Sequence, residues 1–154
     1  MKYRDLIVDA MKGHGADYCE IRIEETDNTR LTYRGNSLDA IAQTSGLGGN
    51  VRAATKGGWG FASFNSLSDL SNKVSDAVAQ SKVVGSSKTE LGCVEPTIDI
   101  VPAHIVEDPF AFTLDEKKRK MDHYNDLVWS VAGINSADII YGDTSRKTFF
   151  GNSD

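Results

Sequence analysis

The chain has 154 residues, of which 40% are hydrophobic and 25% charged, and its formal net charge is −5. This is the size and composition of one ordinary globular domain, or of one small domain with part of another. It excludes a disulfide-dependent mini-protein, a disordered chain and a collagen-like chain. No run approaches the roughly 20 apolar residues of a membrane-spanning helix, so we expect no membrane partner.

The sequence shows neither an N-terminal targeting signal nor a cysteine motif. Charged residues interrupt the apolar positions of the N-terminal segment, so we expect no signal peptide and a cytoplasmic location. The two cysteines, Cys19 and Cys93, form no Cys-x-x-Cys motif, which argues against a disulfide framework and against a zinc knuckle. Cys19 is interpreted as a small buried apolar side chain.

The acidic excess lies in the second half of the chain. Residues 1–84 carry ten basic and ten acidic side chains, whereas residues 85–154 carry seven and twelve. Residues 85–113 alone hold one lysine and five acidic residues. Because nucleic-acid phosphates attract basic surfaces, we expect no direct binding of nucleic acid.

Residues 1–84 are predicted to form an α+β domain. Apolar residues spaced by three and four predict a helix from Tyr3 to Met11, ended by Gly13 and Gly15. Alternation then predicts an antiparallel meander of about five short strands, with turns at 27–28 and 46–49; the strands are 17–25, 29–34, 37–44, 50–56 and 59–65. A stripe from Leu67 to Ser81 predicts a second helix, with Ser66 as its N-cap; its members are Leu67, Leu70, Val74, Ala77, Val78 and Ser81.

Residues 85–113 are predicted to be an extended, acidic connector, because all three prolines of the chain fall within them. Residues 114–154 are predicted to start a second, truncated unit with a helix and an incomplete hairpin. Thr113 to Glu116 has the form of a capping box, and the apolar face of the helix continues to Val131. Strands are expected at 137–141 and from Ser145.

The end of the chain resembles an earlier segment. Residues 145–153 read Ser-Arg-Lys-Thr-Phe-Phe-Gly-Asn-Ser, and residues 29–37 read Thr-Arg-Leu-Thr-Tyr-Arg-Gly-Asn-Ser. Three more strands are predicted after the first copy, but only Asp154 follows the second. An edge strand without a partner is an aggregation hazard, so we expect the chain to be a piece of a longer protein. Chance similarity of two polar hairpins is the alternative.

The sequence contains no strong catalytic, phosphate-binding or metal-binding motif. The glycines between residues 35 and 60 lead into strands and not into a helix, so they are interpreted as turns and not as a phosphate loop. His104 with Glu107 and His123 with Asp126 are single pairs, whereas a catalytic zinc needs three protein ligands. His14 is interpreted as a favourable charge at a helix C-terminus. We therefore assign no catalytic, cofactor-binding or metal-ligating residue.

Two further clusters have structural interpretations. Lys117-Lys118-Arg119-Lys120 is the one basic run, and at 3.6 residues per turn it surrounds a helix, so a solvated helix surface is expected. The aromatic residues Tyr33, Trp59, Phe61 and Phe64 could stack bases, but they lie in a neutral half of the chain. We favour core and cross-strand packing for them.

The order of these segments resembles the N-terminal domain of the TldD/PmbA family. The resemblance covers essentially the whole chain and rests on Ala16-Asp17-Tyr18-Cys19-Glu20-Ile21-Arg22, Tyr33-Arg34-Gly35-Asn36-Ser37-Leu38, Gly48-Gly49-Asn50-Val51-Arg52-Ala53 and Gly58-Trp59-Gly60-Phe61-Ala62-Ser63. The acidic crossing, the Lys-rich helix and the turn at Asn152-Ser153-Asp154 agree with it. The resemblance implies a zinc-dependent metallopeptidase, a kind of protein also called a modulator of DNA gyrase. The family's H-E-x-x-x-H motif and its cysteine ligand belong to a C-terminal domain, and one branch of the family lacks the motif and dimerises with the active branch.

Two functions are therefore expected. In the first, the chain is a scaffold and substrate gate for peptides or unfolded proteins. Zinc would lie only in the missing C-terminal domain, and the whole protein would form a homodimer or a heterodimer with a family member. In the second, the chain is a non-catalytic adaptor or an inactive partner subunit that binds a protein. The strand from Ser145 would suit strand addition or completion by the missing chain.

Overall fold

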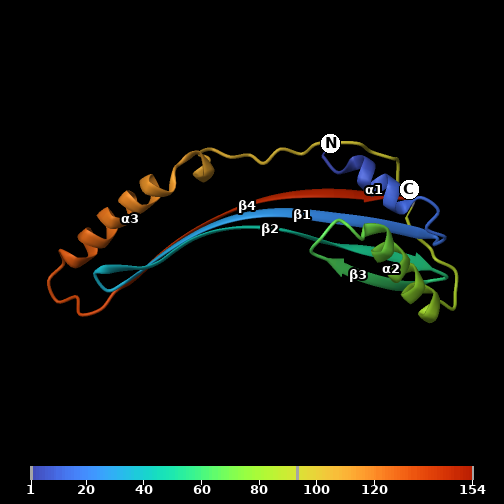
Figure 1. Cartoon of the computed structure of the whole chain (residues 1–154), viewed down its shortest axis with the longest axis horizontal. Coiled ribbons are helices and arrows are strands. Elements are labelled where there is room, and N and C mark those ends of the chain that lie inside the picture. Colours follow the sequence, from blue (N-terminus) through green and yellow to red (C-terminus); the bar gives the residue numbers. More distant parts are fainter. Residues whose placement is uncertain (1, 93, 154) are drawn as a thin grey trace. The chain divides into compact units, whose positions relative to one another are not determined.

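The computed structural model describes residues 2–92 and 94–153, so Cys93 lies outside it. Within these residues the chain is α+β, as predicted, with one four-stranded antiparallel sheet of order β3-β2-β1-β4 (Figure 1). The elements are α1 (Arg4–Met11), β1 (Tyr18–Arg34), β2 (Ser37–Thr55), β3 (Gly58–Phe64), α2 (Leu70–Val84), the 3-10 turn η1 (Pro109–Ala111), α3 (Leu114–Trp129) and β4 (Asp138–Asn152).

The strands are fewer and longer than the sequence predicts. β1 runs through the predicted turn at 27–28, β2 through the one at 46–49, and β4 joins the segments predicted as separate strands. Ladder hydrogen bonds to two neighbours outweigh the local turn preference of Asp-Asn and of glycine. At Gly49 the reason for glycine is space, because a Cβ there would lie 2.1 Å from the carbonyl oxygen of Arg22 and 2.5 Å from the Phe64 ring.

β4 is antiparallel to β1 and is bonded to it near both ends. The Gly35 amide donates to the carbonyl of Ala137 at 2.8 Å, and the Ser153 amide donates to the carbonyl of Cys19 at 2.9 Å. The segment from Ser145, expected to lack a partner, is therefore paired on one side. On the far side of the sheet, β2 and β3 pair from Gly49 opposite Phe64 to Thr55 opposite Gly58.

The chain divides into two compact units, and the first comprises Met1–Glu25, Leu47–Asp99 and Lys147–Asp154. Its core lies between α1, α2 and the adjoining strands; the buried residues are Ile7, Ala10, Met11, Cys19, Ile21, Ile23, Val51, Ala53, Ala62, Phe64, Leu70, Val74, Ala77 and Val78. Cys19 is fully buried, as predicted. Gly60 lets β3 approach α2, because a Cβ there would lie 1.9 Å from the carbonyl oxygen of Ala77.

The two helices of this unit differ in how well their ends were predicted. α1 is confirmed and is followed by Gly13 and Gly15 with φ of +67° and +65°. α2 begins three residues later than predicted, with Asp69 at its N-cap position and no side-chain cap. The N-cap prediction for Ser66 is wrong because its hydroxyl instead accepts a bond from the Ser68 amide, in a local turn before the helix.

The second unit comprises Thr26–Gly46 and Ile100–Arg146. Its small core joins α3 to the strands; the buried residues are Leu31, Tyr33 and Met121, with Leu38, Leu114, Ile139 and Tyr141 packed against them. The capping box is confirmed, since Thr113 Oγ1 accepts from the Glu116 amide and Glu116 Oε2 accepts from the Thr113 amide. α3 ends at Trp129, so Val131 lies beyond it.

Candidate functional site

The histidines identified in the sequence do not form a metal site. His104 and His123 are exposed, and within residues 2–92 and 94–153 no three His, Cys, Asp or Glu side chains are grouped to hold a metal ion. The side chains that the structure describes therefore offer no ligand set for a zinc ion. His14 Nδ1 accepts a hydrogen bond from the Ala16 amide at 3.1 Å. The interpretation of His14 as a favourable charge at the end of α1 stays a prediction.

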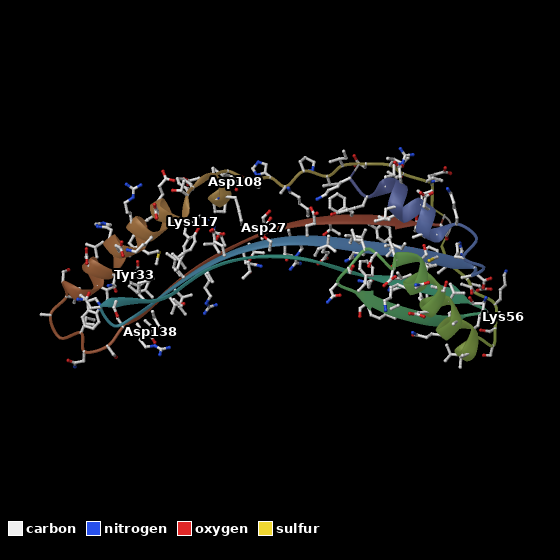
Figure 2. All side chains as sticks on the ribbon, in the orientation of Figure 1. Asp27, Tyr33, Lys56, Asp108, Lys117 and Asp138 are labelled. Atoms are coloured by element: carbon white, nitrogen blue, oxygen red, sulfur yellow. The ribbon has the colours of Figure 1, made fainter. Side chains whose placement is uncertain are left out.

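The second unit contains a buried ion pair between α3 and β4. The Nζ of Lys117 lies 2.8 Å from Oδ2 of Asp143, and the two side chains are only 4% and 6% exposed. Lys117 Nζ also donates to Thr29 Oγ1 at 3.4 Å. Figure 2 shows Lys117 on the side of α3 that faces the strands. The prediction of a wholly solvated basic run is therefore wrong for Lys117, and the pair with Asp143 was missed.

Aromatic side chains surround the charged groups of this pair. The Lys117 ammonium lies 4.9 Å from the centre of the Phe110 ring and 6.0 Å from that of Tyr141. The Tyr141 hydroxyl donates to Asp143. Burial acts to raise the pKa of Asp143, but the hydrogen bonds from Lys117 and Tyr141 outweigh it and hold that pKa below its usual value. Burial and the bond to Asp143 raise the pKa of Tyr141 to about 12.

Other polar contacts fix the rest of α3 to the hairpin of β1 and β2. The Tyr33 hydroxyl donates to Asp122 at 2.5 Å, and the Lys118 ammonium donates to the same carboxylate at 2.7 Å. Further along the helix, Trp129 Nε1 donates to the carbonyl of Gly35 at 3.1 Å. Burial and the bond to Asp122 raise the pKa of Tyr33 to about 12. The helix is therefore held by directional bonds along its length as well as by its small apolar core.

A pocket of about 340 Å³ lies beside the ion pair. Its apolar lining comes from Pro109, Phe112, Met121, Tyr124 and Tyr141, and its charged lining from Glu107, Glu116, Lys117 and Lys120. Among these residues Tyr141 alone belongs to a strand, so the pocket lies on the β4 side of α3. This volume is at the lower end of the range for small-molecule sites and suits one bulky side chain of a ligand.

The aromatic cluster expected in the core is divided between two environments. Tyr33 and Phe64 are buried as predicted, but Trp59 is 45% and Phe61 53% exposed. β3 alternates strictly, so its even-numbered residues face the core and Trp59 and Phe61 face outward. Arg52 lies over the Trp59 ring at 5.1 Å and is bonded to Glu20 at 2.6 Å.

Comparisons with known proteins find a family model, a curated relative and solved structures that are similar to this chain. Residues 19–81 match the model for PmbA/TldA metallopeptidase domain 1. A metalloprotease of Synechocystis sp. is 30% identical over 141 residues, which cover 90% of this chain and 30% of that protein.

Solved structures share the fold at low identity. TldE from Thermococcus kodakarensis aligns with a TM-score of 0.77 at 15% identity, over 99% of this chain and 35% of that one. A protein from Bacteroides thetaiotaomicron, named as a modulator of DNA gyrase, aligns with a TM-score of 0.76 at 18% identity, over 99% and 37%. The chain thus spans about a third of the length of these relatives. Within the described ranges no helix has the length and apolarity needed to cross a membrane.

Proposed function

The chain belongs to the TldD/PmbA family through its first metallopeptidase domain, and from this premise we propose that it is the scaffold and substrate gate of a zinc-dependent metallopeptidase. One observation supports the proposal that this chain is the scaffold and that another part of the protein holds the catalytic residues. The family match is to a metallopeptidase domain, yet the described residues offer no set of metal ligands. The zinc and the residues that activate water would then be supplied by another part of the whole protein.

The physical basis of the scaffold role is the way α3 is attached to the sheet. A gate must keep its shape while a peptide passes, and buried directional contacts give a single geometry where apolar packing alone is more adaptable. The Lys117–Asp143 pair and the Tyr33–Asp122 bond supply such contacts at two points of the helix. Peptides or unfolded proteins are the proposed substrates, a second family member the proposed dimer partner, and the cytoplasm the proposed location.

The test compares the product of the complete gene with the isolated chain. We expect the complete product to bind zinc, measured by atomic emission, and to cleave an unfolded reporter peptide, and we expect the isolated chain to do neither. Removal of this domain from the complete product should allow cleavage of a folded protein that the intact enzyme spares. Tight zinc binding and peptide cleavage by the isolated chain would contradict the proposed division of labour, and unchanged selectivity after removal would contradict the gate.

A non-catalytic adaptor or inactive partner subunit is the second candidate function. The exposed Trp59 and Phe61 beside Arg52 favour it, because tryptophan and arginine are enriched at the energetic centres of protein interfaces. The two candidates differ in the rest of the gene. An H-E-x-x-x-H motif downstream supports the peptidase, whereas a homologous downstream region without it supports the inactive partner.

A further inference from the structure

The lining of the pocket beside α3 is held in place by the fold. One part of it belongs to η1, where the Asp108 side chain accepts a hydrogen bond from the Phe110 amide at 2.9 Å. The most buried apolar residue of the lining is Met121, which belongs to the small core of this unit. The Tyr141 ring is fixed through its hydroxyl, which donates to the carboxylate of the buried ion pair. The pocket is therefore preformed, and a ligand does not have to order these residues when it binds.

Two aromatic side chains of the lining remain available to a ligand. Phe112 is 42% and Tyr124 45% exposed, although both border the pocket. Phe112 precedes the N-cap of α3, and an apolar residue at that position usually packs on the fourth residue of the helix. Here that residue is Lys117, whose ammonium is held by Asp143, so Phe112 has no apolar partner at that position. The pocket therefore presents aromatic surface to an incoming group.

The four charged residues of the lining differ in whether they already have partners. Lys117 is paired with Asp143, and Glu116 closes the capping box. Glu107 and Lys120 are exposed, and within residues 2–92 and 94–153 neither side chain forms an ion pair or a hydrogen bond. A carboxylate can accept from a peptide N–H, and an ammonium can donate to a peptide carbonyl. The pocket thus combines an apolar cavity with one unpaired acceptor and one unpaired donor.

These groups match the chemistry of an unfolded peptide segment. A volume of about 340 Å³ holds one bulky side chain, and the aromatic rings and the Met121 sulfur interact favourably with another aromatic ring. A folded protein keeps most of its aromatic side chains buried and its backbone groups paired, whereas an unfolded segment exposes both. The pocket therefore has the features needed to distinguish an unfolded chain from a folded one.

We propose that this pocket is an anchoring site for substrate, which takes one aromatic side chain of an unfolded polypeptide while Glu107 and Lys120 bond to the neighbouring backbone. The inference rests on the function proposed above, and it adds the side-chain chemistry by which the gate selects its substrates. The site binds the peptide without cleaving it. Burial of the aromatic ring should raise the affinity by about tenfold or more over an alanine at the same position.

Peptide binding by the complete gene product tests the proposal, with EDTA present so that metallopeptidase activity is arrested. The probe is a short fluorescein-labelled glycine–serine peptide with one central phenylalanine, and the matched control peptide has alanine there. Fluorescence anisotropy should give a Kd about tenfold or more lower for the phenylalanine peptide. Equal Kd values would overturn the proposal. So would a preference that the isolated chain shows and the complete product lacks, because the rest of the polypeptide would then cover the pocket.

A matched pair of variants assigns the preference to the pocket. Phe112→Ser removes an exposed ring of the lining, and Leu127→Ser is the control, because Leu127 is 51% exposed on α3 and does not line the pocket. Phe112→Ser should remove most of the preference for phenylalanine, and Leu127→Ser should keep it. Tyr124→Ser repeats the test at the second exposed ring, in case Phe112→Ser alters the fold. A preference that survives in folded Phe112→Ser and Tyr124→Ser would overturn the proposal.

The anchoring site and the proposed function can fail separately. If the complete product neither binds zinc nor cleaves peptides, the peptidase proposal fails, but a preference that Phe112→Ser removes would still support the anchoring site. If the product cleaves unfolded peptides while the two Kd values are equal, only the anchoring site fails. Dimerisation of the isolated chain that Phe112→Ser abolishes would assign the pocket to a second copy and overturn the peptide proposal.

Discussion

Removing the charge of Lys117 tests directly how much the buried ion pair stabilises the second unit. Lys117→Met keeps an unbranched side chain of similar length between Phe110 and Tyr141 but leaves the Asp143 carboxylate without its cation. That carboxylate is 6% exposed, so water cannot replace the lost partner. The remaining bond from Tyr141 does not neutralise the charge.

The expected loss is about 3–5 kcal/mol, the usual cost of leaving one member of a buried ion pair alone. Replacing both members, as in Lys117→Met with Asp143→Leu, removes the buried charge entirely. Such double replacements are often neutral or stabilising, so the double variant should recover most of the loss. The coupling between the two sites is then several kcal/mol and opposite in sign to the single effects.

The assay is urea denaturation followed by the fluorescence of Trp129, which belongs to the second unit, in a Trp59→Phe background. Lys120→Met is the matched control, because Lys120 lies on the same helix with an exposed side chain; we expect a change within about 0.5 kcal/mol. A loss below about 1 kcal/mol for Lys117→Met would refute the reasoning. Additive losses in the double variant would also refute it, since they would mean that the two groups do not interact.

The contribution of the same pair to folding stability should change with pH in one direction. The pKa of Asp143 is lowered in the folded chain, so its contribution to stability is fully present above the unfolded value of about 3.9. That contribution is lost as the pH falls through the folded pKa. The difference in stability between the parent and Lys117→Met should therefore narrow in acid. A difference that stays constant from neutral pH to about pH 2 would contradict this assignment.

Three further predictions address the rest of the fold. Thr113→Ala should cost about 1 kcal/mol by removing the N-cap of α3, measured by urea denaturation, and Thr113→Ser should retain most of that stability. Gly60→Ala should destabilise by about 1–3 kcal/mol through its clash with α2, whereas Gly92→Ala, which meets no atom within 4 Å, should change little. Burial raises the pKa of Cys19 to about 11, so in a Cys93→Ser background its alkylation at neutral pH should proceed only through unfolding; rapid labelling of the native chain would contradict its burial.

Elements whose signals are local were predictable from the sequence. The helix at Arg4–Met11 was identified by apolar spacing and the glycines after it, and the start of α3 by a capping box four residues long. Both signals act within one or two helical turns, so the distant chain does not change them. The start of α2 was harder, because Ser66 offered a good cap in sequence but forms a turn with Ser68.

The lengths of the strands were not predictable in the same way. Asp27-Asn28 and the glycines at 46–49 have real turn preferences, and only the pairing with neighbouring strands decides against them. Asp27 itself shows the outcome, because its carboxylate accepts a bond from the Ser45 hydroxyl of β2 at 2.6 Å. A residue read as the tip of a turn is thus a cross-strand partner.

The missed ion pair has the same origin as the misread strand. Gly142-Asp143 has the composition of a turn, and a turn there would place Asp143 in water, away from α3. Once the strand continues, Asp143 follows Ile139 and Tyr141 at steps of two and faces the same side, where α3 packs. Lys117 then meets a buried carboxylate 26 positions further along the chain, and one lysine of a basic run becomes a core residue. The local error in secondary structure therefore hid the buried ion pair of this unit, and the position of Lys117 in the lining of the pocket was hidden with it.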